Sequence, residues 1–285
     1  MNNANLSYRA WKNEFLKTLS DSYDIREAES LFFGILEMLG LSKLDFMMND
    51  QQIPTEEVQK KISESLHRLK NEEPLQYITG KVFFDDLIFN IDHRALIPRP
   101  ETEELVNWIA KRHTQAKSFL DVCTGSGCIA MSLKNRLPNA IISACDLSAD
   151  ALSLARENQK LLDLDIKIFK ADALGSWKEM DAYDVIVSNP PYIPQADARL
   201  MFNNVLEHEP HMALFVKDND PLVFYREIAK RGLLHLNPGG TLYYEIHEDF
   251  PKEMVQLMED LGYEQVLLKK DLQGKDRMLS AQKRA

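Results

Sequence analysis

The fold is decided by the stretch Phe119-Leu120-Asp121-Val122-Cys123-Thr124-Gly125-Ser126-Gly127-Cys128-Ile129-Ala130. Its apolar start is typical of a buried strand, and its small residues stand between that strand and a helix. Small residues at such a turn let the backbone approach a ligand closely at the helix N-terminus, where free N–H groups point outward. One glycine-rich turn is a weak signal, because a tight strand-to-helix crossing also favours glycine.

Strand-like and helix-like segments alternate from Lys117 onward, which is the pattern of a largely parallel sheet with helices on both faces. Helices are expected over residues 149–162 and 221–234. The sequence therefore predicts an α/β fold with strands near Phe119–Val122, Ile141–Asp146, Ile166–Ala171, Asp184–Ser188, Thr241–Ile246, Gln265–Leu268 and Arg277–Ala281.

Polar residues follow these strands at the carboxyl edge, where open α/β sheets bind ligands. Asp146 ends the second strand, and a carboxylate there accepts hydrogen bonds from both hydroxyls of a ribose. Asp146 could equally cap the helix that starts at Ser148, and the two roles are compatible. Asp172 and the neighbouring Ala173 end the third strand, where Asp172 could meet an adenine amino group.

The fourth strand ends in Asn189-Pro190-Pro191-Tyr192. Two successive prolines neither continue a ladder nor start a helix, so the chain leaves the sheet extended with unpaired carbonyls. Those carbonyls, a carboxamide and an aromatic ring suit a planar NH2 group. A proline-rich loop with no ligand is the alternative reading.

The segment before the sheet predicts helices and then a hairpin. Apolar residues recur at helical spacing in the first 73 residues, with Asp24, Gly40 and Thr55 placed to cap helices. Period-two alternation around Asp85-Asp86 predicts a β-hairpin, and Thr102 is expected to cap the next helix. We divide the chain into a helical domain (1–76), a hairpin linker (77–97) and the sheet domain (98–285).

Composition narrows the function classes. The net charge of −10 argues against a protein that grips duplex DNA, which usually needs a basic stripe. Neither a membrane span nor a leader segment is evident, and the three cysteines fit neither a disulfide framework nor a zinc pattern. We therefore expect reduced thiols, a cytoplasmic protein and no membrane association. His208 and His211 flank Glu209, but we read them as loop residues and expect no metal.

The chain resembles the class I S-adenosylmethionine-dependent methyltransferases and, within them, the HemK/PrmC family, which methylates the glutamine of the Gly-Gly-Gln motif in peptide chain release factors. The resemblance implies a Rossmann-like sheet of seven mostly parallel strands, the last antiparallel, with an N-terminal helical bundle and a hairpin linker. It covers nearly the whole chain. The stretches that carry it are Gly80–Phe84, Ile97–Glu103, the glycine loop, Asn189–Tyr192, Glu209-Pro210, Ala213-Leu214 and Gly274–Arg277.

Roles follow from this resemblance. S-adenosylmethionine is the implied cofactor, S-adenosylhomocysteine the product, and a class I release factor the partner, without stable nucleic-acid binding. The family usually has glycine where this chain has Cys123, which puts the fit of that turn in doubt. The implied substrate-binding residues are Asn189, Pro190, Pro191 and Tyr192. The implied cofactor-binding residues are Cys123, Thr124, Gly125, Ser126, Gly127, Asp146, Asp172, Ala173 and Asn189.

We hypothesise that Asn189, Pro190 and Tyr192 carry the chemistry without a general base. Asn189 Oδ1 and the Pro190 carbonyl would each accept one N–H of the substrate amide, and Tyr192 would pack on the amide plane. Three alternatives remain open here: an adenine amino-methyltransferase acting on nucleic acid, a dinucleotide-dependent oxidoreductase, and a non-catalytic binding protein.

Overall fold

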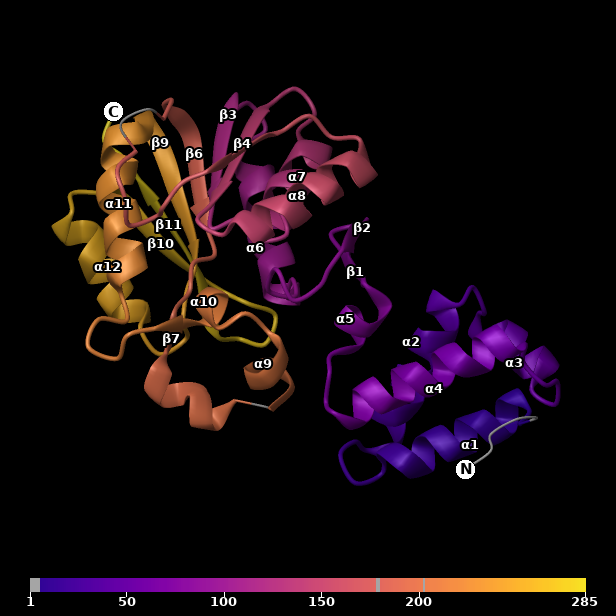
Figure 1. The fold of residues 1–285 in the computed structure, drawn as a ribbon. Coiled ribbons are helices and arrows are strands. Elements are labelled where there is room, and N and C mark those ends of the chain that lie inside the picture. Colours follow the sequence, from indigo (N-terminus) through magenta and orange to yellow (C-terminus); the bar gives the residue numbers. More distant parts are fainter. Residues whose placement is uncertain (1–5, 178–179, 202) are drawn as a thin grey trace. The chain divides into compact units, whose positions relative to one another are not determined.

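The computed structural model describes residues 6–177, 180–201 and 203–285, and it falls into two compact units (Figure 1). The first unit is Met1–Gly80 with Phe202–His208, and the second is Lys81–Met201 with Glu209–Ala285. Each unit has a hydrophobic core of its own.

The first unit is helical. Its core holds Trp11, Phe15 and Phe32, all almost fully buried. The predicted caps are present: Asp24 accepts hydrogen bonds from two backbone N–H groups, and Thr55 from one. Its helices are α1 (Tyr8–Leu19), α2 (Ile25–Met38), α3 (Lys43–Asn49), α4 (Glu56–Lys70), α5 (Leu75–Thr79) and α9 (Asn203–His208).

The second unit begins with the predicted hairpin, in which β1 (Lys81–Phe84) pairs antiparallel with β2 (Leu87–Asn90). Asp85 and Asp86 form the turn, with φ angles of 50° and 63°. A two-residue hairpin turn of this hand matches the twist of the strands, and Asp tolerates positive φ better than most residues.

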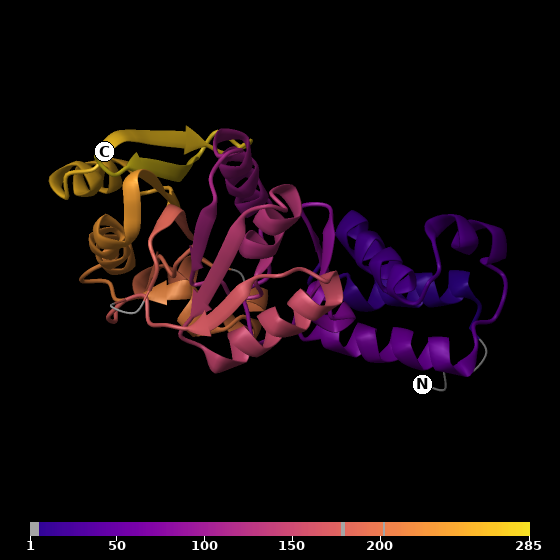
Figure 2. The ribbon, with the colours of Figure 1, turned by 90° about the horizontal axis from the view of Figure 1, so that it is seen from above.

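The main sheet has seven strands in the order β10-β11-β9-β6-β3-β4-β5, as the resemblance implied. The pairs from β9 to β5 are parallel, and β11 runs antiparallel to both of its neighbours. Figure 2 shows β10 and β11, in yellow, together at one edge. The strands are β3 (Ser118–Val122), β4 (Ile141–Asp146), β5 (Lys167–Lys170), β6 (Tyr183–Ser188), β9 (Leu236–Glu245), β10 (Glu264–Lys270) and β11 (Asp276–Gln282).

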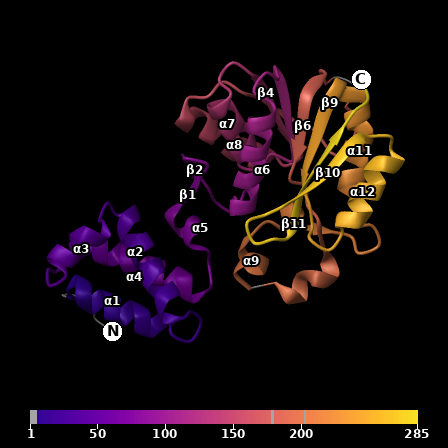
Figure 3. The same ribbon diagram turned by 180° about the vertical axis from the view of Figure 1, so that it is seen from behind.

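Helices cover both faces of this sheet, because its central strands are apolar on both sides. Figures 1 and 3 show α6, α7 and α8 on one side and α11 and α12 on the other. Tyr225 and Ile228 of α11 and Met254 of α12 pack with residues of the sheet in one buried cluster. The five helices are α6 (Pro100–Arg112), α7 (Cys128–Arg136), α8 (Ala149–Leu162), α11 (Val223–His235) and α12 (Pro251–Asp260).

The prediction that Thr102 caps α6 is wrong. The helix begins at Pro100 with Arg99 at the cap position, since proline suits the first helical position. Thr102 is buried, and its hydroxyl is used elsewhere. Short elements complete this unit: β7 (Ile193–Pro194), η1 (Gln195–Leu200), α10 (His211–Leu214) and β8 (Phe215–Val216).

Across the described part of the chain, no helix combines the length and the apolar character that crossing a membrane requires.

Candidate active site

A cavity of about 270 Å³ lies at the carboxyl edge of the main sheet. Residues that follow β3, β4, β5 and β6 line it together, as do residues from two later segments. This is the edge at which ligands bind in such sheets. The lining includes Ala95, Pro98, Arg99, Thr102, Cys123, Thr124, Gly125, Ser126, Asp146, Leu147, Asp150, Asp172, Ala173, Asn189, Pro191, Pro210, Met212 and Phe224.

Most of the residues predicted from the sequence meet in this cavity. The glycine-loop residues Cys123–Ser126 line it, together with the three strand-end residues Asp146, Asp172 and Asn189. Among the described residues, Gly127, Pro190 and Tyr192 are the predicted site residues that lie outside its lining. Their positions define what each can do.

The glycine loop is shaped by hydrogen bonds and by close packing. The N–H of Gly125 donates to Asp146 Oδ2 at 3.0 Å, and that of Gly127 to the carbonyl of Thr124 at 2.9 Å. Gly127 has a φ of +84°, and a Cβ there would lie 2.6 Å from Cε of Met131. The positive φ favours glycine at Gly127, and a larger residue would also displace the end of the Met131 side chain, even though Gly127 does not line the cavity.

Asp121 lies beneath this loop and was not among the predicted site residues. Its Oδ2 accepts hydrogen bonds from the Thr124 hydroxyl at 2.5 Å and from the Ala130 N–H at 3.3 Å. Its Oδ1 is buried and has no partner among the described residues. Burial raises the pKa of Asp121 to about 7. Asp121 therefore holds the loop from below through Thr124 and Ala130, and it does not itself line the cavity.

Asp146 ends β4 and anchors two segments at once. Its second oxygen accepts from the Ser148 N–H at 2.9 Å. The cap of α8 is Ser148 itself, whose hydroxyl accepts from Ala151, so Asp146 supports the turn without being the cap. Burial is the largest effect on Asp146 and raises its pKa, against the backbone hydrogen bonds that lower it.

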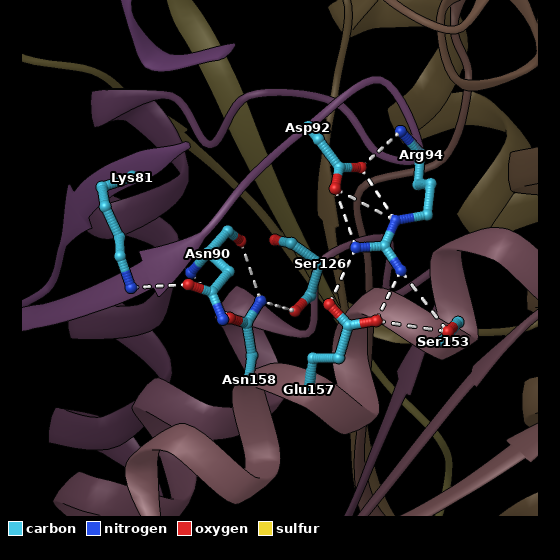
Figure 4. A network of polar contacts seen from close by, with 8 residues as sticks. All are labelled: Lys81, Asn90, Asp92, Arg94, Ser126, Ser153, Glu157 and Asn158. Atoms are coloured by element: carbon cyan, nitrogen blue, oxygen red, sulfur yellow. Dashed lines mark hydrogen bonds and ion pairs between the residues drawn. The ribbon is translucent and has the colours of Figure 1, made fainter. Parts of the chain in front are cut away.

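A buried carboxamide on α8 joins the hairpin to the glycine loop (Figure 4). Asn158 is fully buried; its Oδ1 accepts from the Asn90 N–H at 2.7 Å. Its Nδ2 donates at 3.0 Å to the carbonyls of both Asn90 and Ser126. Arg94 makes a second link between the same regions, pairing with Asp92 and Glu157. The loop's position thus depends on the hairpin.

We expect Asn158→Ala to lower the free energy of unfolding by about 2–4 kcal/mol, because it removes three hydrogen bonds to backbone groups, one of them buried and two partly buried. Urea denaturation followed by circular dichroism measures this. The matched control is Asn90→Ala: the Asn90 side chain makes only an exposed contact to Lys81, worth about 0–1 kcal/mol. Equal losses in the two variants would contradict the role given to Asn158.

Cys123 stands in the glycine loop where the resemblance implies a glycine. Its φ is 62°, in the left-handed region that favours glycine. The side chain lines the cavity and also packs against the core cluster of the α11–α12 face. Burial raises the pKa of the thiol well above its ordinary value, so the thiol stays neutral. The residue is strained but compatible with the turn.

Cys123→Gly should therefore leave the affinity for S-adenosylmethionine, the cofactor that the resemblance implies, unchanged or higher. The free energy of unfolding should change by no more than about 1 kcal/mol, since relief of backbone strain opposes loss of side-chain packing. Cys123→Val should lower stability by about 1–3 kcal/mol, because a branched side chain at positive φ is both strained and overpacked. Titration calorimetry with S-adenosylmethionine and thermal unfolding test the pair. A large loss of donor affinity in the glycine variant would show that the thiol itself contacts the donor.

Asn189 is half-buried and lines the cavity, whereas Tyr192 is half-buried and lies outside the lining. The Tyr192 hydroxyl donates to Glu245 at 3.1 Å, and its ring meets that of His247 edge-on at 5.8 Å. Asn189 donates from Nδ2 to Thr102 Oγ1 at 3.4 Å. The prolines between them are buried, and Pro191 also lines the cavity.

Two buried glutamates contact residues of this cavity wall, and neither was among the predicted site residues. Glu209 accepts a hydrogen bond from the Ile97 N–H at 3.1 Å and pairs with Arg99. Glu245 accepts from Thr102 and Tyr192. Neither contact can be read from sequence spacing, because the partners are 143 residues apart in the case of Thr102 and Glu245. Within the described ranges, no cluster of three His, Cys, Asp or Glu residues could hold a metal ion.

Comparisons with known proteins agree with this geometry. Residues 9–80 match the family model described as the PrmC N-terminal domain, and residues 100–211 match the Methyltransferase small domain. The release factor glutamine methyltransferase of Flavobacterium psychrophilum is 41% identical over 276 residues, covering 94% of this chain and 96% of that protein. That of Bacteroides thetaiotaomicron is 42% identical, covering 93% and 96%.

The chain belongs to the release factor glutamine methyltransferase family. It is an enzyme of the methyltransferase class. Solved structures support the fold alone: the catalytic domain of human Mettl16 in complex with an RNA hairpin is 19% identical, with a TM-score of 0.54 over 69% of this chain and 74% of that one. A methyltransferase from Pyrococcus furiosus gives a TM-score of 0.50 at 17% identity, covering 69% and 89%.

Proposed function

We propose that this protein transfers the methyl group of S-adenosylmethionine to the side-chain amide nitrogen of the glutamine in the Gly-Gly-Gln motif of peptide chain release factors, with S-adenosylhomocysteine as the product. One observation carries the proposal: Asn189 and the glycine loop share a single cavity. Family membership supports the same reaction and does not favour the adenine alternative.

The donor would be held by the loop Cys123–Ser126 and by the strand ends. Asp146 presents a carboxylate for ribose hydroxyls, and Asp172 with Ala173 borders the remaining wall. When bound, S-adenosylmethionine supplies a sulfonium methyl group, and the protein supplies position and electric field.

The substrate amide needs help because its nitrogen lone pair is delocalised into the carbonyl. In this proposal Asn189 Oδ1, at the cavity wall, accepts one N–H of that amide. The carbonyl of Pro190, a buried residue between the lining residues Asn189 and Pro191, accepts the other and helps to hold the nitrogen in place. The same two dipoles stabilise the positive charge that develops on nitrogen. No residue is required to remove a proton beforehand. For Tyr192 this proposal departs from the sequence-based hypothesis that its ring packs on the amide plane. Tyr192 lies outside the cavity lining and its hydroxyl donates to Glu245, so in this scheme it supports the cavity wall.

The domain division follows this proposal. Residues 1–76 recognise the release factor away from its glutamine, residues 77–97 link, and residues 98–285 perform the transfer. A short Gly-Gly-Gln loop gives little binding area, so a second contact region is needed. Three free cysteines and a release-factor substrate support a cytoplasmic location, and the net charge of −10 supports the absence of stable nucleic-acid binding.

Mass spectrometry tests the proposal. A purified release factor is incubated with this protein and S-adenosylmethionine, beside a variant release factor whose motif glutamine is replaced and an adenine-containing oligonucleotide. We expect one added methyl on the motif glutamine only. An unmodified glutamine under these conditions would overturn the proposal, and methylated adenine would establish the alternative.

A further inference from the structure

A chain of hydrogen bonds starts at Asn189 and Thr102, which both line the cavity, and continues to Glu245 and Tyr192, which do not. Asn189 Nδ2 donates to Thr102 Oγ1 at 3.4 Å, and the Thr102 hydroxyl donates to Glu245 Oε2 at 2.6 Å. The hydroxyl of Tyr192 donates to the other carboxylate oxygen, Oε1, at 3.1 Å. Thr102 and Glu245 are each only 2% exposed. Water therefore has little access to this chain, and its internal partners decide its arrangement.

The number of available protons fixes the direction of this chain. An ionised carboxylate only accepts hydrogen bonds, and a threonine hydroxyl has a single proton to donate. The Thr102 hydroxyl donates its one hydrogen bond to Glu245, so toward Asn189 its oxygen can only accept a hydrogen bond. The group that Asn189 turns toward Thr102 must then be its NH2. Its Oδ1 is then at the end of the carboxamide directed away from Thr102, on a residue that borders the cavity.

The surroundings of Glu245 favour this direction. Burial raises its pKa, while the hydrogen bonds from Thr102 and Tyr192 and the positive charge of Arg277 act against that rise. Burial also raises the pKa of the Tyr192 phenol, so Tyr192 keeps its proton and remains a donor. The geometry decides the direction: the hydroxyls of Thr102 and Tyr192 each contact a different oxygen of Glu245, at 2.6 Å and 3.1 Å, and each hydroxyl has a hydrogen to donate.

We propose that Thr102 and Glu245 are positioning residues that set the orientation of the Asn189 carboxamide, so that it presents an oxygen and not an NH2 to the substrate. The inference rests on the proposed function, in which Asn189 accepts an N–H of the target amide. If the Asn189 carboxamide were rotated by about 180°, its NH2 group would face an N–H group of the substrate amide, and no hydrogen bond could form. Without the threonine oxygen as a hydrogen-bond acceptor for Nδ2, both orientations of the Asn189 carboxamide become accessible.

Three variants separate this role from simple support of the fold. Thr102→Val removes the hydroxyl at constant shape, Thr102→Ser restores it, and Tyr192→Phe removes the other hydroxyl donor to Glu245. Thr102→Val and Tyr192→Phe each deprive the same carboxylate of one partner. Their effects on unfolding should therefore be similar, while only Thr102→Val breaks the link to Asn189.

We expect Thr102→Val to lower kcat for release-factor methylation by about tenfold, the effect of losing one hydrogen bond, with the Kd for S-adenosylmethionine unchanged. Thr102→Ser should recover most of the lost rate, and Tyr192→Phe should lower kcat less than Thr102→Val does. A loss in Tyr192→Phe equal to or larger than that in Thr102→Val would overturn the inference, as would a serine variant no better than valine.

A second readout needs no substrate. The side-chain NH2 resonances of Asn189, assigned by their disappearance in Asn189→Ala, should exchange slowly with water in the wild type and in Thr102→Ser. In Thr102→Val they should exchange faster. Unchanged exchange in the valine variant overturns the inference whether or not the protein methylates release factors. Absence of methylation with the expected exchange behaviour overturns the proposed function alone.

Discussion

Asn189→Ala is expected to lower kcat for release-factor methylation by about 30-fold to 1000-fold, which corresponds to about 2–4 kcal/mol of barrier. The variant removes one of the two oxygens that hold the substrate amide and stabilise charge on its nitrogen. The Pro190 carbonyl belongs to the backbone and remains. Steady-state kinetics with saturating donor measure the loss. The free energy of unfolding should change little, since the Asn189 side chain is half-buried and makes one long hydrogen bond.

The matched control is Asn107→Ala. Asn107 is also half-buried and makes one long contact, to Arg136 at 3.4 Å, but it lies on α6 outside the cavity lining in the described structure. Its replacement should leave kcat within about twofold of wild type, as for most substitutions away from a site. If Asn189→Ala behaved like this control, the assignment of Asn189 would fail and the chemistry would have to lie elsewhere in the cavity.

The sheet was predictable from the sequence because its signals are local. Strand β4 occurs at Ile141–Asp146, and α8 spans residues 149–162, both with the expected bounds. Apolar runs, turn residues and caps fix such elements within a few residues. The boundaries moved where the signal was weaker: β9 starts at Leu236 rather than Thr241, ahead of two glycines that also read as a turn.

The cavity was predictable in part for a topological reason. Parallel strands bring their carboxyl ends to one edge, so Asp146, Asp172 and Asn189 could be expected to meet without any knowledge of side-chain packing. Cys123 could not be judged from sequence alone. Its doubtful fit depends on a backbone φ of 62°, and the tolerance of a thiol there depends on the core cluster it packs against.

The support of the wall could not be predicted. Tyr192 follows two prolines, and its hydroxyl contacts Glu245, a residue on a strand much later in the chain. Thr102 looked like a helix cap because capping residues and buried hydroxyl donors share the same amino-acid types. Only the packed structure distinguishes the two uses, since the distinction lies in long-range contacts.

Asp146→Asn is expected to weaken the binding of S-adenosylmethionine by about tenfold to a hundredfold, because a hydrogen bond to a charged group is worth about 1.5–3 kcal/mol. The change keeps the size of the side chain but halves its accepting capacity, and Asp146 already uses both oxygens on Gly125 and Ser148. The asparagine NH2 would also oppose one of those two N–H groups. The loss should therefore appear in Kd by titration calorimetry before it appears in kcat.

Asp150→Asn supplies the comparison, because Asp150 lines the same cavity but is exposed and stands in the first turn of α8. Its replacement should change donor affinity several times less. Protonation gives an independent check on Asp146: burial raises its pKa, so donor affinity should begin to fall at a higher pH on the acid side than an ordinary aspartate would allow. The fall should be weaker in Asp146→Asn, which has no carboxyl proton to gain. If the affinity for S-adenosylmethionine fell by the same amount at low pH in both proteins, another titrating group would cause the fall. Asp146 would then not belong to the S-adenosylmethionine site.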